Sequence, residues 1–145
     1  MVASSGGHLF QLTRLREGWS RHDRHWVTFD TPDARSLLAG EAVTYAAHPT
    51  NRNIPNLLRN TWIAIRLIAR LRPRAILTTG AGVAIPFCWI GRLAGARVVY
   101  IESFARIDDP SLTGRVVHPV ATDFFVQWPG VKRHFRKAQY RGALF

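Results

Sequence analysis

Short apolar runs alternate with stretches of helical periodicity along the whole chain, and no repeat or low-complexity linker separates them. Short runs rich in β-branched and aromatic residues are typical of buried parallel strands. Such strands are predicted at residues 1–4, 25–29, 42–46, 75–78, 97–101, 123–126 and 139–141. Helices are predicted from the apolar spacing at residues 7–19, 33–39, 55–71, 83–93, 112–117 and 131–136. This alternation predicts an α/β fold with a doubly wound parallel sheet.

Local signals at the helix ends support these assignments. Pro55 suits the first turn of the long helix, where a missing N–H has little effect, and Pro73 marks its end. Asp33 is predicted to cap the second helix, and Gly40 to adopt a left-handed conformation after it. In a doubly wound sheet, ligands bind beyond the carboxyl ends of the strands, where the strand order reverses. We therefore expect function at the residues that directly follow strands.

Size and composition narrow the class of protein. The 145 residues fit one domain, 1–145, and a hydrophobic content of 47% is enough for a core. Cys88 is the single cysteine, so no intramolecular disulfide forms, which fits a reduced, cytoplasmic setting. A net charge of +11 predicts attraction to nucleic acid, anionic lipid headgroups or phosphorylated small molecules. Charge alone does not choose among them, but no nucleic-acid module is present.

The membrane is the partner that the apolar stretches favour. We expect no signal peptide, and the longest charge-free run, residues 75–91, falls short of the ~20 apolar residues of a spanning helix. The chain is therefore expected to be soluble or peripheral. On the helix 55–71, Arg59, Arg66 and Arg70 share one face, so this helix is predicted to lie on an anionic bilayer. Trp62 and Trp89 favour the same interpretation; the alternative is an ordinary helix that covers the sheet.

A glycine-containing turn follows the first predicted strand. Ser5, Gly6 and Gly7 lead into a helix, so their backbone N–H groups and the helix dipole predict an anion site, with phosphate as its natural ligand. The Gly-Lys-Ser/Thr ending of a P-loop is absent. His8 lies at the helix start, where the dipole favours a neutral imidazole that can accept a proton. The alternatives are a tight turn and a histidine that only forms structural hydrogen bonds.

A second glycine pair follows the fourth strand. Gly80 and Gly82, with Glu102 twenty residues further on, imitate a dinucleotide-binding fingerprint. Ile85 stands where the third small residue belongs and would hold the helix off the sheet. We therefore interpret the pair as a second close-approach loop that lines the same crevice. A nucleotide-cofactor protein remains the less favoured alternative, and no cofactor is expected.

Polar residues also follow the strand 97–101. Glu102 and Ser103 come directly after it, with Arg106 close behind. A carboxylate at this edge can act as a base or bind sugar hydroxyls; the alternative is a structural acid paired with an arginine. The histidines are scattered and no acidic cluster accompanies them, so no metal site is expected.

Four stretches together resemble a known family: residues 3–9, 72–86, 100–106 and 125–129. They are similar to the acceptor-side, membrane-associating subunit of split GT-B glycosyltransferases. This family includes the anchoring subunit of the UDP-GlcNAc transferase of asparagine-linked glycosylation and its bacterial exopolysaccharide and capsule counterparts. The resemblance implies a Rossmann-like N-terminal half of a GT-B enzyme, with a separate catalytic subunit that carries the UDP-sugar site. It also implies that residues 138–145 dock on that partner. The expected partner contacts are Trp128, Tyr140, Ala143, Leu144 and Phe145.

The functional hypothesis combines the interpretation of the individual residues with the family resemblance. The chain is expected to position a polyprenyl-diphosphate-linked sugar whose hydroxyl attacks a UDP-sugar on the partner, at the inner face of the cell membrane. Amides around Gly6 and Gly7 would bind diphosphate, Arg106 would offset its charge, and His8 or Glu102 would take the proton. The chain alone is expected to be nearly inactive. The main alternative is a noncatalytic scaffold that recruits a glycosyltransferase to the membrane.

Overall fold

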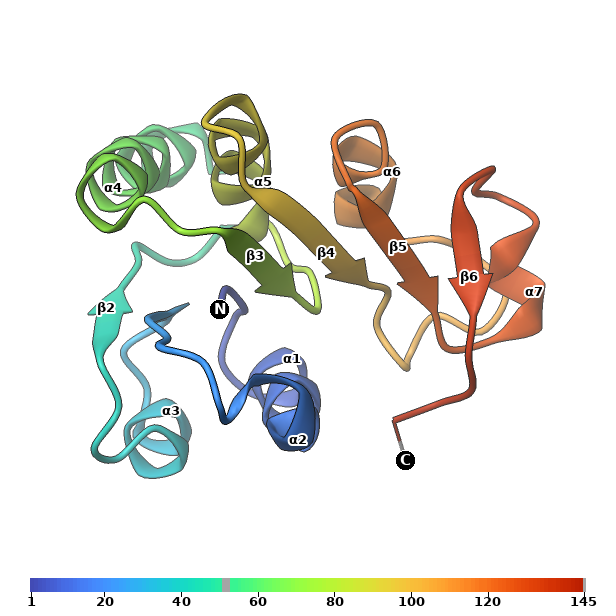
Figure 1. Ribbon diagram of the computed structural model, residues 1–145, viewed down its shortest axis with the longest axis horizontal. Coiled ribbons are helices and arrows are strands. Elements are labelled where there is room, and N and C mark those ends of the chain that lie inside the picture. Colours follow the sequence, from blue (N-terminus) through green and yellow to red (C-terminus); the bar gives the residue numbers. More distant parts are fainter. Residues whose placement is uncertain (51–52, 145) are drawn as a thin grey trace.

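The computed structural model describes residues 1–50 and 53–144, and a parallel sheet runs through its middle (Figure 1). Its strands are β1 (Trp26–Thr28), β2 (Val43–Tyr45), β3 (Ala75–Thr78), β4 (Arg97–Ile101), β5 (Asp123–Val126) and β6 (Ala138–Tyr140). β1 pairs with β2, and the other strands follow in the order β3-β4-β5-β6. Parallel bridges from Val2 to Val27 and to Thr78 join the two groups. The strand order therefore reverses at Val2, as a doubly wound sheet requires.

Helices cover both faces of the sheet (Figure 1). They are α1 (Gly7–Arg14), α2 (Arg16–Trp19), α3 (Pro32–Leu37), α4 (Ile54–Leu71), α5 (Ala84–Leu93), α6 (Leu112–Val117) and α7 (Pro129–Lys132). On one face α4 contacts α5 and α5 contacts α6. On the other face lie α1, α2 and α3.

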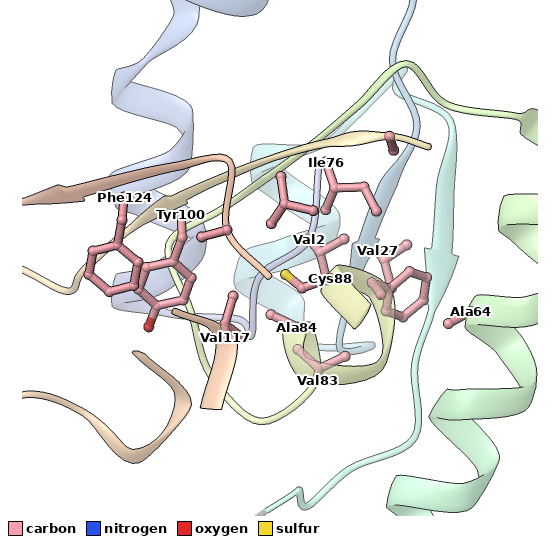
Figure 2. Close-up of a cluster of buried hydrophobic side chains, with 14 of the residues drawn as sticks. Val2, Val27, Ala64, Ile76, Val83, Ala84, Cys88, Tyr100, Val117 and Phe124 are labelled. Carbon is pink, nitrogen blue, oxygen red and sulfur yellow. The ribbon is translucent and has the colours of Figure 1, made fainter. Parts of the chain in front are cut away.

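Each face buries its own hydrophobic cluster. The larger cluster lies under α4, α5 and α6, and Figure 2 shows Cys88 and Val2 at its centre. At one end of it the rings of Tyr100 and Phe124 stack with centroids 4.7 Å apart (Figure 2). The smaller cluster packs Leu9 and Leu12 of α1 against Trp26. The two helix layers thus enclose the sheet from both faces.

The predicted helices and strands are found, except that the strand predicted at residues 1–4 is reduced to isolated bridges at Val2. Three details of the helices also differ. Leu15 interrupts the predicted helix 7–19, so α1 and α2 are separate. The helix predicted at 131–136 is shorter and begins earlier, because Pro129 occupies its first turn. The cap position of α3 is taken by Thr31 and not by Asp33, which lies within the first turn. Gly40 is left-handed, with φ 82°, and Pro55 lies in the first turn of α4, both as predicted.

None of the helices in the described ranges combines the length and the apolar content that a membrane span needs.

Candidate functional site

His8 is fastened to the end of β3 by a reciprocal pair of hydrogen bonds. Its ring Nδ1 lies 2.8 Å from the carbonyl oxygen of Thr79, and the Thr79 hydroxyl donates to the carbonyl of His8 at 2.7 Å. A carbonyl oxygen only accepts, so Nδ1 carries the proton in this contact. In the neutral ring Nε2 then has the lone pair, and it makes no hydrogen bond to the described residues. His8 therefore presents a fixed ring with an open proton acceptor.

The surroundings of His8 favour the neutral imidazole. Burial lowers the pKa of His8 below its usual 6.5, and the charge of Arg106 acts in the same direction. The Thr79 carbonyl and the charge of Glu102 oppose this shift without reversing it. This direction agrees with the expected neutral imidazole, and burial is its largest cause.

The glycine loop after β3 approaches His8 closely. Gly80 has φ 105°, and a Cβ built there would lie 2.8 Å from the Tyr100 hydroxyl and 3.5 Å from His8 Cε1. Both the backbone conformation and the space therefore require glycine. Gly82 faces Thr50 instead, with a virtual Cβ 3.2 Å from the Thr50 side chain. The two glycines are close-approach positions, as predicted, but only Gly80 borders His8.

Glu102 is a buried residue, 1% exposed, and both of its carboxylate oxygens accept hydrogen bonds. Oε2 accepts from the N–H and the hydroxyl of Ser111 at 3.1 and 3.0 Å. Oε1 accepts from the N–H of Ser103 at 3.0 Å and from the Tyr100 hydroxyl at 3.4 Å. A Cβ on Gly114 of α6 would overlap Oε2. Glu102 thus joins β4 to the start of α6, and its partners are N–H groups and hydroxyls, not the arginine of the alternative interpretation.

The glycine turn before α1 differs from a free anion site. Gly6 has φ 73° and ψ −138°, which is a glycine conformation. Its N–H donates to Oδ2 of Asp33 at 2.8 Å, so one predicted phosphate ligand already holds a carboxylate. Asp33, predicted as a helix cap, therefore belongs to this turn. The exposed Gly7 is the first residue of α1, and Ser5 is half-buried beside it.

Ser103 and Arg106 lie in the loop after β4. Ser103 is buried, and its carbonyl accepts the N–H of Arg106 at 2.9 Å. The Arg106 side chain is exposed, and its charge acts on His8. The structure thus gathers His8, Gly80, Glu102 and Arg106 at one edge of the sheet.

A buried amide network beneath this edge was missed by the sequence analysis. Gln127, directly after β5, donates to Gln11 Oε1 at 2.8 Å and to the Glu102 carbonyl at 3.0 Å. Gln11 Oε1 also accepts from the N–H of Phe104 at 2.9 Å. On its other side Gln127 accepts the N–H of Leu144 at 2.9 Å. One side chain therefore joins α1, the loop after β4 and the tail after β6.

The predicted partner contacts fall into two groups. Trp128 is half-buried, and its indole N–H donates to the carbonyl of Phe104 at 2.6 Å, so it supports the loop after β4. Tyr140 and Ala143 are exposed, and Leu144 is half-buried. Phe145 lies outside the described residues.

The described residues do not support a metal site or a dinucleotide-binding site. Within residues 1–50 and 53–144, no group of three His, Cys, Asp or Glu side chains could hold a metal ion. Ile85, at the third position of the imitated fingerprint, packs against the larger core cluster. What the edge can do is hold a polar ligand against a fixed imidazole.

Comparisons with known proteins find relatives of similar sequence. The chain is 28% identical to the human "UDP-N-acetylglucosamine transferase subunit ALG14", over 99% of this chain and 81% of that protein. It is 37% identical to the subunit of the same name from Eremothecium gossypii, over 74% of this chain and 52% of that protein.

A solved structure shows the same architecture. MurG of Acinetobacter baumannii superposes with a TM-score of 0.76 at 19% identity, over 96% of this chain and 44% of the MurG chain. The chain thus spans less than half of MurG, and the likeness is to the N-terminal half of that GT-B protein. The predicted Rossmann-like doubly wound fold is confirmed. Residues 42–144 match the family described as "Oligosaccharide biosynthesis protein Alg14 like", and the chain belongs to this family.

Proposed function

We propose that this chain is the acceptor-binding subunit of a two-chain glycosyltransferase that acts on a polyprenyl-diphosphate-linked sugar. Relatives that cover nearly the whole chain are named subunits of a UDP-N-acetylglucosamine transferase, which supports transfer from a UDP-sugar with a second subunit. The biosynthetic setting is lipid-linked oligosaccharide or bacterial exopolysaccharide and capsule assembly. The observation that carries the proposal is the fixed His8 ring with its open Nε2 at the carboxyl edge of the sheet.

In the proposed reaction His8 takes the proton. The acceptor hydroxyl attacks the anomeric carbon of the UDP-sugar, the bond to UDP breaks, and UDP leaves with the electron pair. The hydroxyl proton moves to Nε2 of His8, while Nδ1–H stays on the Thr79 carbonyl. The charge of Glu102, which raises the pKa of His8, stabilises the imidazolium that forms. Glu102 is assigned this supporting role because its oxygens already accept hydrogen bonds.

The diphosphate is assigned to the two loops that border His8. The exposed N-terminus of α1 at Gly7 offers backbone donors and the positive end of the dipole. Arg106 supplies a cation from the other side. Gly6 contributes only where the ligand displaces Asp33 from its N–H.

The remaining surfaces are assigned to the partner and the membrane. The catalytic subunit is placed on Tyr140, Ala143 and Leu144, and it would bring the UDP-sugar to the edge that holds His8. The membrane is placed on α4, where Leu58 is 65% and Trp62 is 61% exposed. This arrangement gives a peripheral protein at the inner face of the cell membrane.

The test is a reconstituted pair of this chain and its catalytic subunit, with a UDP-sugar and a polyprenyl-diphosphate acceptor. The variant His8→Gln should lower kcat/KM by ~10²-fold or more, because general-base catalysis is lost. The wild-type rate should fall on the acid side at a pH below the ordinary histidine value of 6.5, and the variant should lack this limb.

The matched control is His22→Gln, since His22 is exposed and far from the site in sequence. It should leave rate and pH profile unchanged. An unchanged rate in His8→Gln would favour the noncatalytic scaffold, and sugar transfer by the isolated chain would reject the two-chain enzyme.

A further inference from the structure

A small pocket that shares no lining residue with the His8 site lies between α4 and the outermost strand β2. It has a volume of about 250 Å³ and is lined by Thr44, Ile63, Arg66, Leu67 and Arg70. Thr44 comes from β2, and the other lining residues come from consecutive turns of α4. The pocket, called here the α4–β2 pocket, combines an apolar floor with two guanidinium groups.

Both arginines lack a carboxylate partner. The ion pairs among the described residues are Arg24–Glu41, Arg35–Asp30 and Arg97–Asp123, and none involves Arg66 or Arg70. No acidic residue lines the pocket. The Thr44 hydroxyl, which lies 2.8 Å from Nε2 of His25, adds a third polar group. Two guanidinium groups and a hydroxyl around one opening are donors suited to a phosphate.

The surface beside the pocket indicates where that phosphate comes from. Ile54, Leu58, Trp62 and Ile65 are exposed and follow one another at helical spacing along α4. Arg66 and Arg70 lie one and two turns beyond Trp62, on the flank of this apolar stripe that faces β2. An interfacial helix buries its apolar stripe at the acyl boundary and keeps its arginines at the headgroups. A free phosphate ion would make no contact with the apolar stripe, whereas a membrane lipid supplies both a phosphate and acyl chains.

We propose that the α4–β2 pocket binds the phosphate of an anionic membrane lipid, with Arg66 and Arg70 as its ligands. The proposal rests on the membrane contact of α4 proposed above and makes it specific. The apolar stripe gives depth in the bilayer, and the pocket selects lipids that carry a net negative phosphate headgroup. The pocket is separate from His8, so lipid selection and sugar transfer are expected to respond to different substitutions.

The experiment measures co-sedimentation of the full chain with phosphatidylcholine vesicles that do or do not contain phosphatidylglycerol. The double variant Arg66→Gln/Arg70→Gln should lose ~30-fold in partitioning to anionic vesicles, since each arginine near the surface contributes about 1 kcal/mol. Both side chains are exposed and unpaired among the described residues, so the variant should unfold at the same urea concentration as the wild type.

Two controls separate the pocket from net charge. The double variant Arg14→Gln/Arg16→Gln removes the same charge from the other face of the sheet and should change partitioning little. Arg59→Gln removes a charge from α4 outside the pocket and should cost less than Arg66→Gln. Equal losses in Arg59→Gln and Arg66→Gln would overturn the pocket and leave general attraction to the bilayer.

Two further outcomes would also overturn the proposal. Saturable binding of inorganic phosphate that requires Arg66 and Arg70, without a vesicle effect, would overturn the lipid as the source of the phosphate. If the wild type fails to sediment with anionic vesicles at low salt, both the proposed membrane contact of α4 and the proposed lipid pocket are refuted. Sugar transfer in the reconstituted pair is measured separately, so the acceptor-binding role is tested independently.

Discussion

At the scale of single residues, the site depends on which polar atoms are already occupied. His8 keeps one ring nitrogen open because Thr79 holds the other, whereas both oxygens of Glu102 have donors. Two residues that are equal candidates in the sequence thus become unequal in the fold. In the proposed reaction it is therefore the geometry, and not the residue type, that favours His8 over Glu102 as the proton acceptor.

The network around Gln127 leads to a stability prediction. The substitution Gln127→Ala leaves the Glu102 carbonyl and the Leu144 N–H without their partner. Since Gln127 is 2% exposed, water does not replace these bonds in full. The free energy of unfolding, measured with urea, should fall by about 1–3 kcal/mol.

The control for this variant lies on the neighbouring strand. Gln139 of β6 is half-buried, and within the described residues its side chain bonds only to the exposed Arg141. Gln139→Ala should change the free energy of unfolding by less than about 0.5 kcal/mol. Equal losses in the two variants would refute the role given to the buried amide.

Sequence patterns find some of these residues and miss others for a physical reason. Gly80 and Glu102 follow strands of the structure, and His8 follows the predicted strand 1–4, which the structure reduces to bridges at Val2. Strand prediction together with residue chemistry therefore leads to all three. Gln127 also follows a strand, but a neutral amide has no charge or periodicity that marks it. The bond between Gly6 and Asp33 joins residues 27 positions apart, and no local pattern encodes it.

At the scale of elements, the prediction of bounds succeeds best in the second half of the chain. The strands 75–78, 97–101 and 123–126 and the helix 112–117 are found with the predicted bounds. The three strands are short, mostly apolar runs, and the helix begins directly after Ser111, whose hydroxyl accepts the N–H of Gly114 as a cap. The break at Leu15 was missed because the segment has no proline there. In the structure the indole N–H of Trp19 donates to the carbonyl of Leu12 across the break, and no local pattern marks this contact.

The attachment of α4 gives a prediction at this scale. Asn60 accepts the N–H of Ala47 at 2.8 Å and donates to the carbonyl of Ala47 at 2.9 Å, and so fastens α4 to the segment after β2. Asn60 is 1% exposed. Asn60→Leu keeps the side chain bulky but leaves both backbone groups unpaired, so the free energy of unfolding should fall by about 1–3 kcal/mol.

The adjacent Thr61 serves as a comparison in the same urea titration. Its hydroxyl donates to the carbonyl of Leu57 within α4 itself. Thr61→Ala should therefore be within about 0.5 kcal/mol of the wild type. A larger loss in Thr61→Ala than in Asn60→Leu would contradict the fastening role.

At the scale of the whole molecule, pH should act on stability in two stages. Burial lowers the pKa of His8, His25 and His118 below 6.5, so the folded state binds fewer protons than the unfolded state. The contribution of these three histidines to stability should be level above pH 6.5 and fall as the pH drops below it, because protonation favours the unfolded chain.

The second stage belongs to the carboxylates. Hydrogen bonds from Arg24 and Arg97 lower the pKa of Glu41 and Asp123, and the Thr31 side chain does the same for Asp33. Their contribution is present above the ordinary carboxylate range and is lost as the pH falls through the lowered values. The urea midpoint from pH 8 to pH 3 should show both stages. A midpoint that stays constant between pH 7 and pH 5 would contradict the first.

The position of Val2 has a consequence for how the chain acquires its fold. Val2 bridges Val27 on one side and Thr78 on the other, so it is the joint between the two groups of strands. During synthesis the first of these partners leaves the ribosome early, but the second follows only after more than half of the 145 residues. The sheet cannot close over Val2 before then, and pairing over such a separation is slow. Until that moment the segment around Val2 keeps an unpaired edge on the side where β3 will pair, and an unpaired edge favours association with other chains.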